Sequence, residues 1–223
     1  FYYFADDFIL DNSDRSWFNV RKMNTPNRNI HKPNLDLAQF KTPPYKDIYK
    51  GYYNYDVVIC NRYNIEWSGV KELNRPINYF NEPFLAELFN KLKDKKIAYF
   101  NIDRSEKKYF DNAHPIKLND YEIVKQFNNI DHISDISKLS KDSFNTTQLK
   151  VMAGAKLFIT MNGGYGIMAS FFGGKNIIYT NPVNVNGKIY PSENQTNDFN
   201  YYHHFGNSKI INVNSYSELL KIV

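Results

Sequence analysis

The clearest pattern in this sequence is the stretch 157–181, which reads Leu-Phe-Ile-Thr-Met-Asn-Gly-Gly-Tyr-Gly-Ile-Met-Ala-Ser-Phe-Phe-Gly-Gly-Lys-Asn-Ile-Ile-Tyr-Thr-Asn. Apolar runs at 157–159 and 177–179 indicate two buried strands. Between them, apolar residues recur at helical spacing, and a glycine pair stands on each side of that segment. The stretch therefore predicts a strand, a glycine-rich turn, a short helix and a second strand, which is the repeating unit of a parallel α/β sheet.

Strand and helix patterns alternate along the rest of the chain from residue 55 onward. Further buried strands are predicted at 57–60, 97–100, 130–133 and 209–213, and helices with one apolar face at 81–92, 121–127, 143–156 and 215–223. Fully apolar strands are typical of a parallel sheet that helices cover on both faces. We therefore expect an α/β fold in residues 55–223, with a doubly wound, mostly parallel, Rossmann-like sheet and a long loop at 182–205. Residues 1–54 contain several prolines and predict a small, irregular N-terminal portion.

Composition and charge limit the classes of function. The chain has 223 residues, of which 42% are hydrophobic and 23% charged, as in globular proteins. Its net charge of +5 slightly favours an anionic ligand, but the lysines are dispersed and form no stripe that would bind nucleic acid. The single cysteine, Cys60, excludes an intrachain disulfide and a cysteine-based zinc site, and the histidines lack a recognisable metal-ligand spacing. With no signal peptide or membrane-length apolar run, we expect a cytoplasmic protein without a membrane span or a bound metal.

Polar residues follow three of the predicted strands, at their carboxyl ends. They are Asn61-Arg62 after the first strand, Asp103 after the second, and Asn162-Gly163-Gly164-Tyr165 inside the stretch quoted above. Because ligands of open α/β sheets bind at the carboxyl ends of the strands, we expect these residues to form a binding site. An arginine can bind a phosphate through two parallel hydrogen bonds, although Arg62 could equally form a surface ion pair with Glu66.

The glycine pair Gly163-Gly164 has two interpretations. A helix that starts there exposes unpaired backbone N–H groups, and without Cβ atoms in the way an anion can approach them. The alternative is a tight turn that needs glycine for backbone reasons alone. The turn lacks the lysine of a P-loop and does not match the dinucleotide fingerprint, which argues against ATP hydrolysis and against a NAD-dependent role.

Four other residues are weaker candidates, each with an alternative role. Thr147 could hydrogen-bond a ribose or a base, or serve helix capping. Tyr165 could stack on a ring of the ligand or pack under the turn. Asp7 and His203 could act as a general base, but adjacent acidic residues and exposed loop histidines are more often solvated than catalytic.

The residues of the glycine-rich unit and of the helix before it resemble a known family. The runs 148–159, 162–164 and 169–179 resemble the nucleotide-sugar-binding C-terminal half of GT-B glycosyltransferases, in the heptosyltransferase and fucosyltransferase-like neighbourhood. The segments 60–67 and 78–80 are similar to uncharacterised bacterial and viral proteins of this kind.

The resemblance implies a metal-independent enzyme that moves a sugar from a nucleotide-diphosphate donor to a hydroxyl of a glycan acceptor, with no further cofactor. It places the donor diphosphate on the helix start at Gly164, with Arg62 as the counter-charge. The acceptor hydroxyl then needs a base, for which Glu66, Asp7 and His203 are the candidates.

The first part of the chain departs from this family. Residues 1–54 are too few for a complete acceptor-binding lobe, so we expect that lobe to be shortened, missing or supplied elsewhere. The alternatives to a transferase are a nucleotide-sugar epimerase and a non-catalytic module that binds a sugar or a nucleotide.

Overall fold

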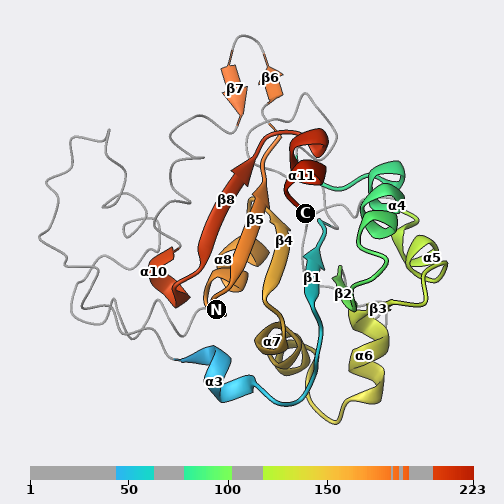
Figure 1. Ribbon diagram of the computed structural model, residues 1–223, viewed down its shortest axis with the longest axis vertical. Coiled ribbons are helices and arrows are strands. Elements are labelled where there is room, and N and C mark those ends of the chain that lie inside the picture. The colour runs from blue at the N-terminus through green and yellow to red at the C-terminus, as the bar shows by residue number, and fades with distance from the viewer. Residues whose placement is uncertain (1–43, 63–77, 102–117, 182, 186–187, 191–202) are drawn as a thin grey trace, which may run out of the picture.

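The computed structural model describes residues 44–62, 78–101, 118–181, 183–185, 188–190 and 203–223, and of these the segments 183–185, 188–190 and 203–204 by their backbone alone. Its centre is a six-stranded sheet in the order β3-β2-β1-β4-β5-β8, in which every neighbouring pair is parallel (Figure 1). The strands are β1 (Val57–Cys60), β2 (Ile97–Phe100), β3 (Ile130–His132), β4 (Leu157–Met161), β5 (Lys175–Tyr179) and β8 (Lys209–Val213). The predicted α/β fold with a parallel, Rossmann-like sheet is therefore confirmed.

Helices cover both faces of the sheet, because successive strand residues point to opposite sides. Val57 and Ile59 of β1 pack into the core under α4 (Glu82–Lys91), α5 (Asp120–Val124) and α11 (Tyr216–Ile222). Val58 and Cys60 pack into the other core, under α6 (Ile133–Leu139), α7 (Phe144–Gly154) and α8 (Gly164–Ser170). Figure 1 shows α11 in front of the sheet and α8 behind it. The doubly wound arrangement follows from strands that are buried on both sides.

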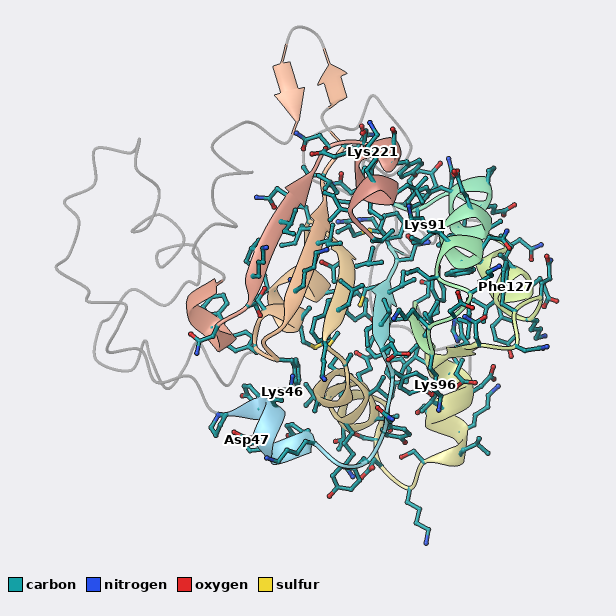
Figure 2. The ribbon with its side chains drawn as sticks, in the orientation of Figure 1. Lys46, Asp47, Lys91, Lys96, Phe127 and Lys221 are labelled. Carbon is teal, nitrogen blue, oxygen red and sulfur yellow. The ribbon has the colours of Figure 1, made fainter. Side chains whose placement is uncertain are left out.

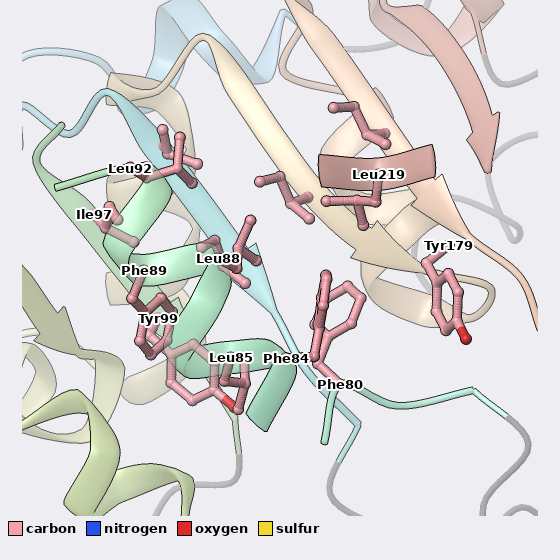
Figure 3. Packing of buried hydrophobic residues seen from close by; sticks show 14 of the residues in the cluster. Phe80, Phe84, Leu85, Leu88, Phe89, Leu92, Ile97, Tyr99, Tyr179 and Leu219 are labelled. Carbon is pink, nitrogen blue, oxygen red and sulfur yellow. The ribbon is translucent and has the colours of Figure 1, made fainter. Parts of the chain in front are cut away.

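The larger core lies against α4 (Figure 3). The helix begins after Asn81, whose side chain accepts the N–H of Phe84 at 3.0 Å and so caps it. Its buried residues recur at the spacing of one helical face, as the sequence predicts: Phe84, Leu85, Leu88 and Phe89. Charged residues such as Lys91 of α4 and Lys221 of α11 lie on the outer surface and are dispersed (Figure 2).

One predicted strand and one predicted helix have the wrong bounds, and one helix was missed. The strand predicted at 130–133 ends at His132, and Ile133 begins α6, a helix that the sequence analysis missed. The imidazole Nδ1 of His132 accepts the N–H of Ser134 at 3.1 Å and thereby starts that helix. The helix predicted at 121–127 is the shorter α5.

Two segments expected to be irregular contain regular structure. The predicted loop 182–205 includes an antiparallel hairpin, β6 (Val183–Val185) with β7 (Lys188–Tyr190), and the short helix α10 (His203–Gly206). In the N-terminal portion, α3 (Tyr45–Tyr49) packs against α7, and the ring of Tyr45 meets Phe171 edge to face. Among the described residues, no helix combines the length and apolar composition needed to cross a bilayer.

Candidate functional site

The order of the strands creates one position where the direction of chain winding reverses. From β1 the chain builds outward through β2 to β3, then returns to place β4 beside β1 and continues outward through β5 to β8. The loops that leave β1 and β4 therefore diverge from the same edge of the sheet. In open α/β sheets such a reversal, at the carboxyl ends of the strands, forms the crevice in which ligands bind. The candidate residues Arg62 and Gly163 follow these two strands.

The side chain of Arg62 reaches across to the glycine turn. Its Nη2 donates a hydrogen bond to the backbone carbonyl of Asn162 at 2.7 Å. A Cβ placed on Gly163 would lie 3.3 Å from the same nitrogen. The structure thus brings together Arg62 and the glycine turn, which the sequence analysis expected to converge. The alternative ion-pair partner, Glu66, lies outside the described residues.

The three glycines of the turn differ in what the fold requires of them. Gly163 has φ of 145°, a backbone conformation that side chains rarely allow. A Cβ on Gly166 would lie 2.9 Å from the carbonyl oxygen of Met161, so close packing of α8 on β4 requires that glycine. Gly164 is exposed, and a Cβ there would meet no atom within 4 Å in the part of the chain that the structure describes. The tight-turn interpretation explains Gly163 and Gly166, but it leaves Gly164 unexplained.

Asn61 is fully buried, and its side chain joins three parts of the chain. The Nδ2 group donates to the carbonyl of Phe80 at 3.0 Å and to the hydroxyl of Tyr99 at 2.9 Å. The Oδ1 atom accepts the N–H of Arg62 and the N–H of Phe80, each at 2.8 Å. These four bonds use the whole hydrogen-bonding capacity of an amide side chain. Asn61 therefore positions the loop and has no capacity left for the ligand contact expected of it.

Two further candidates, Thr147 and Tyr165, make contacts that fit the structural role considered for each of them. Thr147 is fully buried, and its hydroxyl donates to the carbonyl of Ser143 at 3.0 Å within the first turn of α7. Ser143 itself caps that helix by accepting the N–H of Thr146. Tyr165 is half-buried, with its ring edge-on to Phe100 at a centroid distance of 6.0 Å. Thr147 thus belongs to the helix start, and Tyr165 packs beneath the turn.

Three of the remaining candidates are not placed, because Asp7 and Asp103, like Glu66, lie outside the described residues. His203 is the first residue of α10, and its side chain is not described. The helix α10 lies beside the C-terminal end of α8, since Phe205 stacks on Phe171 with ring centroids 4.6 Å apart. It also directly precedes β8, at the amino edge of the sheet (Figure 1). The backbone of His203 is therefore at the opposite edge from Gly164, which does not fit the role of general base at the glycine turn.

The structure adds a buried polar cluster that sequence reasoning missed. The hydroxyl of Tyr99 donates to Oδ2 of Asp120 at 2.7 Å, and Nδ2 of Asn101 donates to the same oxygen. All three residues are buried, and burial raises the pKa of Tyr99 well above its ordinary value, with the charge of Asp120 as the second cause. Tyr99 was hidden inside an apolar strand pattern. The only sequence signal was Asn101, which follows that strand as Asn61 follows β1.

Thr180 is a second residue that sequence reasoning missed. It continues β5, because its N–H donates to the carbonyl of Val213 at 2.9 Å. Ile178 packs toward α8, so strand alternation places Thr180 on that same side, at the carboxyl edge. Its hydroxyl is buried and has no hydrogen-bond partner among the residues that the structure describes. A buried hydroxyl without a hydrogen-bond partner destabilises the fold, so binding of a partner at this position would be favourable.

Comparisons with known proteins identify no family and no homologue for this chain. No protein-family model matches the chain, and no match was found among curated proteins or among solved structures. Within the described ranges, no three His, Cys, Asp or Glu side chains gather in a way that could hold a metal ion. What this chain shares with other proteins is therefore its six-stranded, all-parallel, Rossmann-like α/β sheet.

Proposed function

We propose that this protein is a metal-independent glycosyltransferase, which transfers a sugar from a nucleotide-diphosphate donor to a hydroxyl group of a glycan acceptor. The observation that carries the proposal is the glycine at position 164: its φ is not positive, and none of the described residues would contact a Cβ there, so among them the start of α8 is open to a ligand. The GT-B resemblance of the surrounding sequence suggests which ligand that is.

The proposed donor site combines an open backbone with a fixed positive charge. The first N–H groups of a helix have no partner within the helix and attract anions. Arg62 holds its guanidinium beside this turn, where it donates a hydrogen bond to Asn162. A guanidinium presents five N–H donors in a planar fork, which is the geometry that binds phosphate oxygens. The position at the reversal of strand order is where such a ligand is expected.

This arrangement suits the chemistry of sugar transfer. As the bond from the sugar to the diphosphate breaks, negative charge develops on the departing nucleotide diphosphate. Preorganised donors that point at such a charge lower the barrier of the reaction. Arg62 and the amides after Gly163 supply these donors, and the hydroxyl of Thr180 is a further donor on the same side of the sheet. The acceptor hydroxyl transfers its proton to a base, for which Glu66 and Asp7 remain the candidates.

Two variants test the donor site. Gly164→Val places a branched side chain where the diphosphate would approach, and no atom of the described residues lies within 4 Å of the new Cβ. We expect it to abolish binding of nucleotide sugars while the protein stays folded. Arg62→Ala should weaken binding by about 1.5–3 kcal/mol, or about 10- to 150-fold, which is the range for a hydrogen bond to a charged group. Lys91→Ala, on the exposed side of α4, is the control for loss of one positive charge.

The measurement is calorimetric titration with UDP-, GDP-, ADP- and CMP-sugars, after a thermal-shift screen of the same compounds. Wild-type affinity in both Gly164→Val and Arg62→Ala would refute the diphosphate site. Slow hydrolysis of the bound donor without an acceptor would support a transferase. Formation of an epimeric sugar would indicate the epimerase instead, and stabilisation by free glycans alone would indicate a binding module.

A further inference from the structure

We infer that Tyr99 and Asp120 are positioning residues for the donor site, and that they act on Arg62 through the side chain of Asn61. The expected effect of these residues on ligand binding rests on the proposed function, whereas the hydrogen bonds that connect them do not. The hydroxyl of Tyr99 donates to Asp120 at 2.7 Å and accepts from Nδ2 of Asn61 at 2.9 Å. Oδ1 of Asn61 then accepts the backbone N–H of Arg62 at 2.8 Å. Asp120, Tyr99 and Asn61 are all 0% exposed, so water does not compete for these bonds.

The direction of each hydrogen bond in this relay is set by Asp120. A carboxylate can only accept hydrogen bonds, and Asp120 accepts from the hydroxyl of Tyr99, the amide of Asn101 and the N–H of Tyr121. Tyr99 must therefore give its single proton to Asp120, and its oxygen is left as an acceptor. The Asn61 side chain can satisfy that oxygen only with its NH₂ group. Its carbonyl oxygen consequently points the other way, toward backbone N–H groups.

That orientation holds both ends of the loop between β1 and α4. The carbonyl oxygen of Asn61 accepts the N–H of Arg62, where the loop begins, and the N–H of Phe80, where it ends. From the backbone position that these bonds maintain, the guanidinium of Arg62 reaches the carbonyl of Asn162 at 2.7 Å. A buried carboxylate in the β2 half of the sheet thus sets the place of a positive charge at the reversal point.

The test combines Tyr99→Phe with Arg62→Ala, using inorganic pyrophosphate as the probe. Tyr99→Phe alone should weaken pyrophosphate binding about fivefold, the value of one typical hydrogen bond. If Tyr99 acts through Arg62, the double variant should bind no more weakly than Arg62→Ala, within about twofold. Tyr55→Phe is the matched control, because Tyr55 is also buried and also donates to an aspartate, Asp131, at 2.9 Å, but before the amino end of β1. Tyr55→Phe should bind pyrophosphate as the wild type does.

A second measurement needs no ligand. Amide hydrogen exchange of Arg62 and Phe80 should be faster in Tyr99→Phe than in Tyr55→Phe, after correction for global stability. Equal exchange in the two variants would overturn the relay, and so would an equal loss of binding from Tyr99→Phe with and without Arg62. If the wild type binds neither pyrophosphate nor any nucleotide sugar, the proposed function fails. Faster exchange would still support the relay in that case, so the two failures are distinguishable.

Discussion

Replacing Gly174 by alanine should strongly destabilise the protein, whereas the same replacement at Gly164 should not. Gly174 has φ of 74°, and an added Cβ would lie 2.3 Å from the carbonyl oxygen of Lys156. The left-handed backbone conformation alone costs an L-residue about 1–2 kcal/mol. The carbonyl of Lys156 also accepts the N–H of Lys175 at 2.9 Å, so moving it away strains the pairing at the start of β4 and β5.

These two costs give the expected magnitude. We expect Gly174→Ala to lower the free energy of unfolding by about 2–4 kcal/mol. For a chain of this length, that corresponds to a fall in melting temperature of about 5–15 °C. Gly164 has an ordinary φ, and a Cβ there would contact none of the residues that the structure describes, so alanine should leave stability unchanged or raise it by up to about 1 kcal/mol.

Thermal and urea unfolding, followed by circular dichroism, measure both variants under the same conditions. An unchanged urea m-value would show that the two variants unfold to a similar denatured state. The reasoning is refuted if Gly164→Ala loses as much stability as Gly174→Ala. It is refuted equally if Gly174→Ala unfolds at the wild-type temperature, since the contact with Lys156 would then not exist.

Two other predictions concern the core and its titrating groups. Phe80→Ala removes a side chain that is 0% exposed, so we expect a loss of about 3–5 kcal/mol in urea unfolding; Leu139→Ala, at a side chain that is 90% exposed, should change stability by no more than about 0.5 kcal/mol. Burial raises the pKa of Tyr99 well above the ordinary value of 10.0, so the phenol stays protonated in the fold but ionises in the unfolded chain. The contribution of Tyr99 to stability is therefore complete below pH 10.0 and is lost as the pH rises further, by up to about 1.4 kcal/mol per pH unit. Between pH 8 and pH 11, the free energy of unfolding in urea should decline less in Tyr99→Phe than in the wild type. An equal decline in the two proteins would contradict the assignment.

The sequence predicted well the elements in which burial gives a continuous apolar pattern. The strands β1 and β2 are apolar at every position because helices cover both of their sides. The helix α4 repeats its apolar residues along one face and begins at a capping asparagine. These features act over a few neighbouring residues, so the sequence alone is enough to recognise them.

The elements that were missed carry weak local signals. The strand β3 has only three residues, and α6 starts directly after it because the side chain of His132 caps the helix. Histidine is not a usual capping residue, so the boundary could not be seen in the sequence. The hairpin of β6 and β7 has strands of three residues, too short for a clear alternation.

By itself, the sequence determined the composition of the candidate site: an arginine after one strand and a glycine turn after another. Only the tertiary structure decided that the two meet. They are 100 residues apart along the chain, and the hydrogen bond from Arg62 to Asn162 exists because β4 returns to the position beside β1. The tertiary structure also separated the roles of the individual residues, since only the packing around a side chain shows whether it is still able to bind a ligand. Asn61 uses all of its hydrogen-bonding groups inside the fold, while a Cβ on Gly164 would contact none of the described residues.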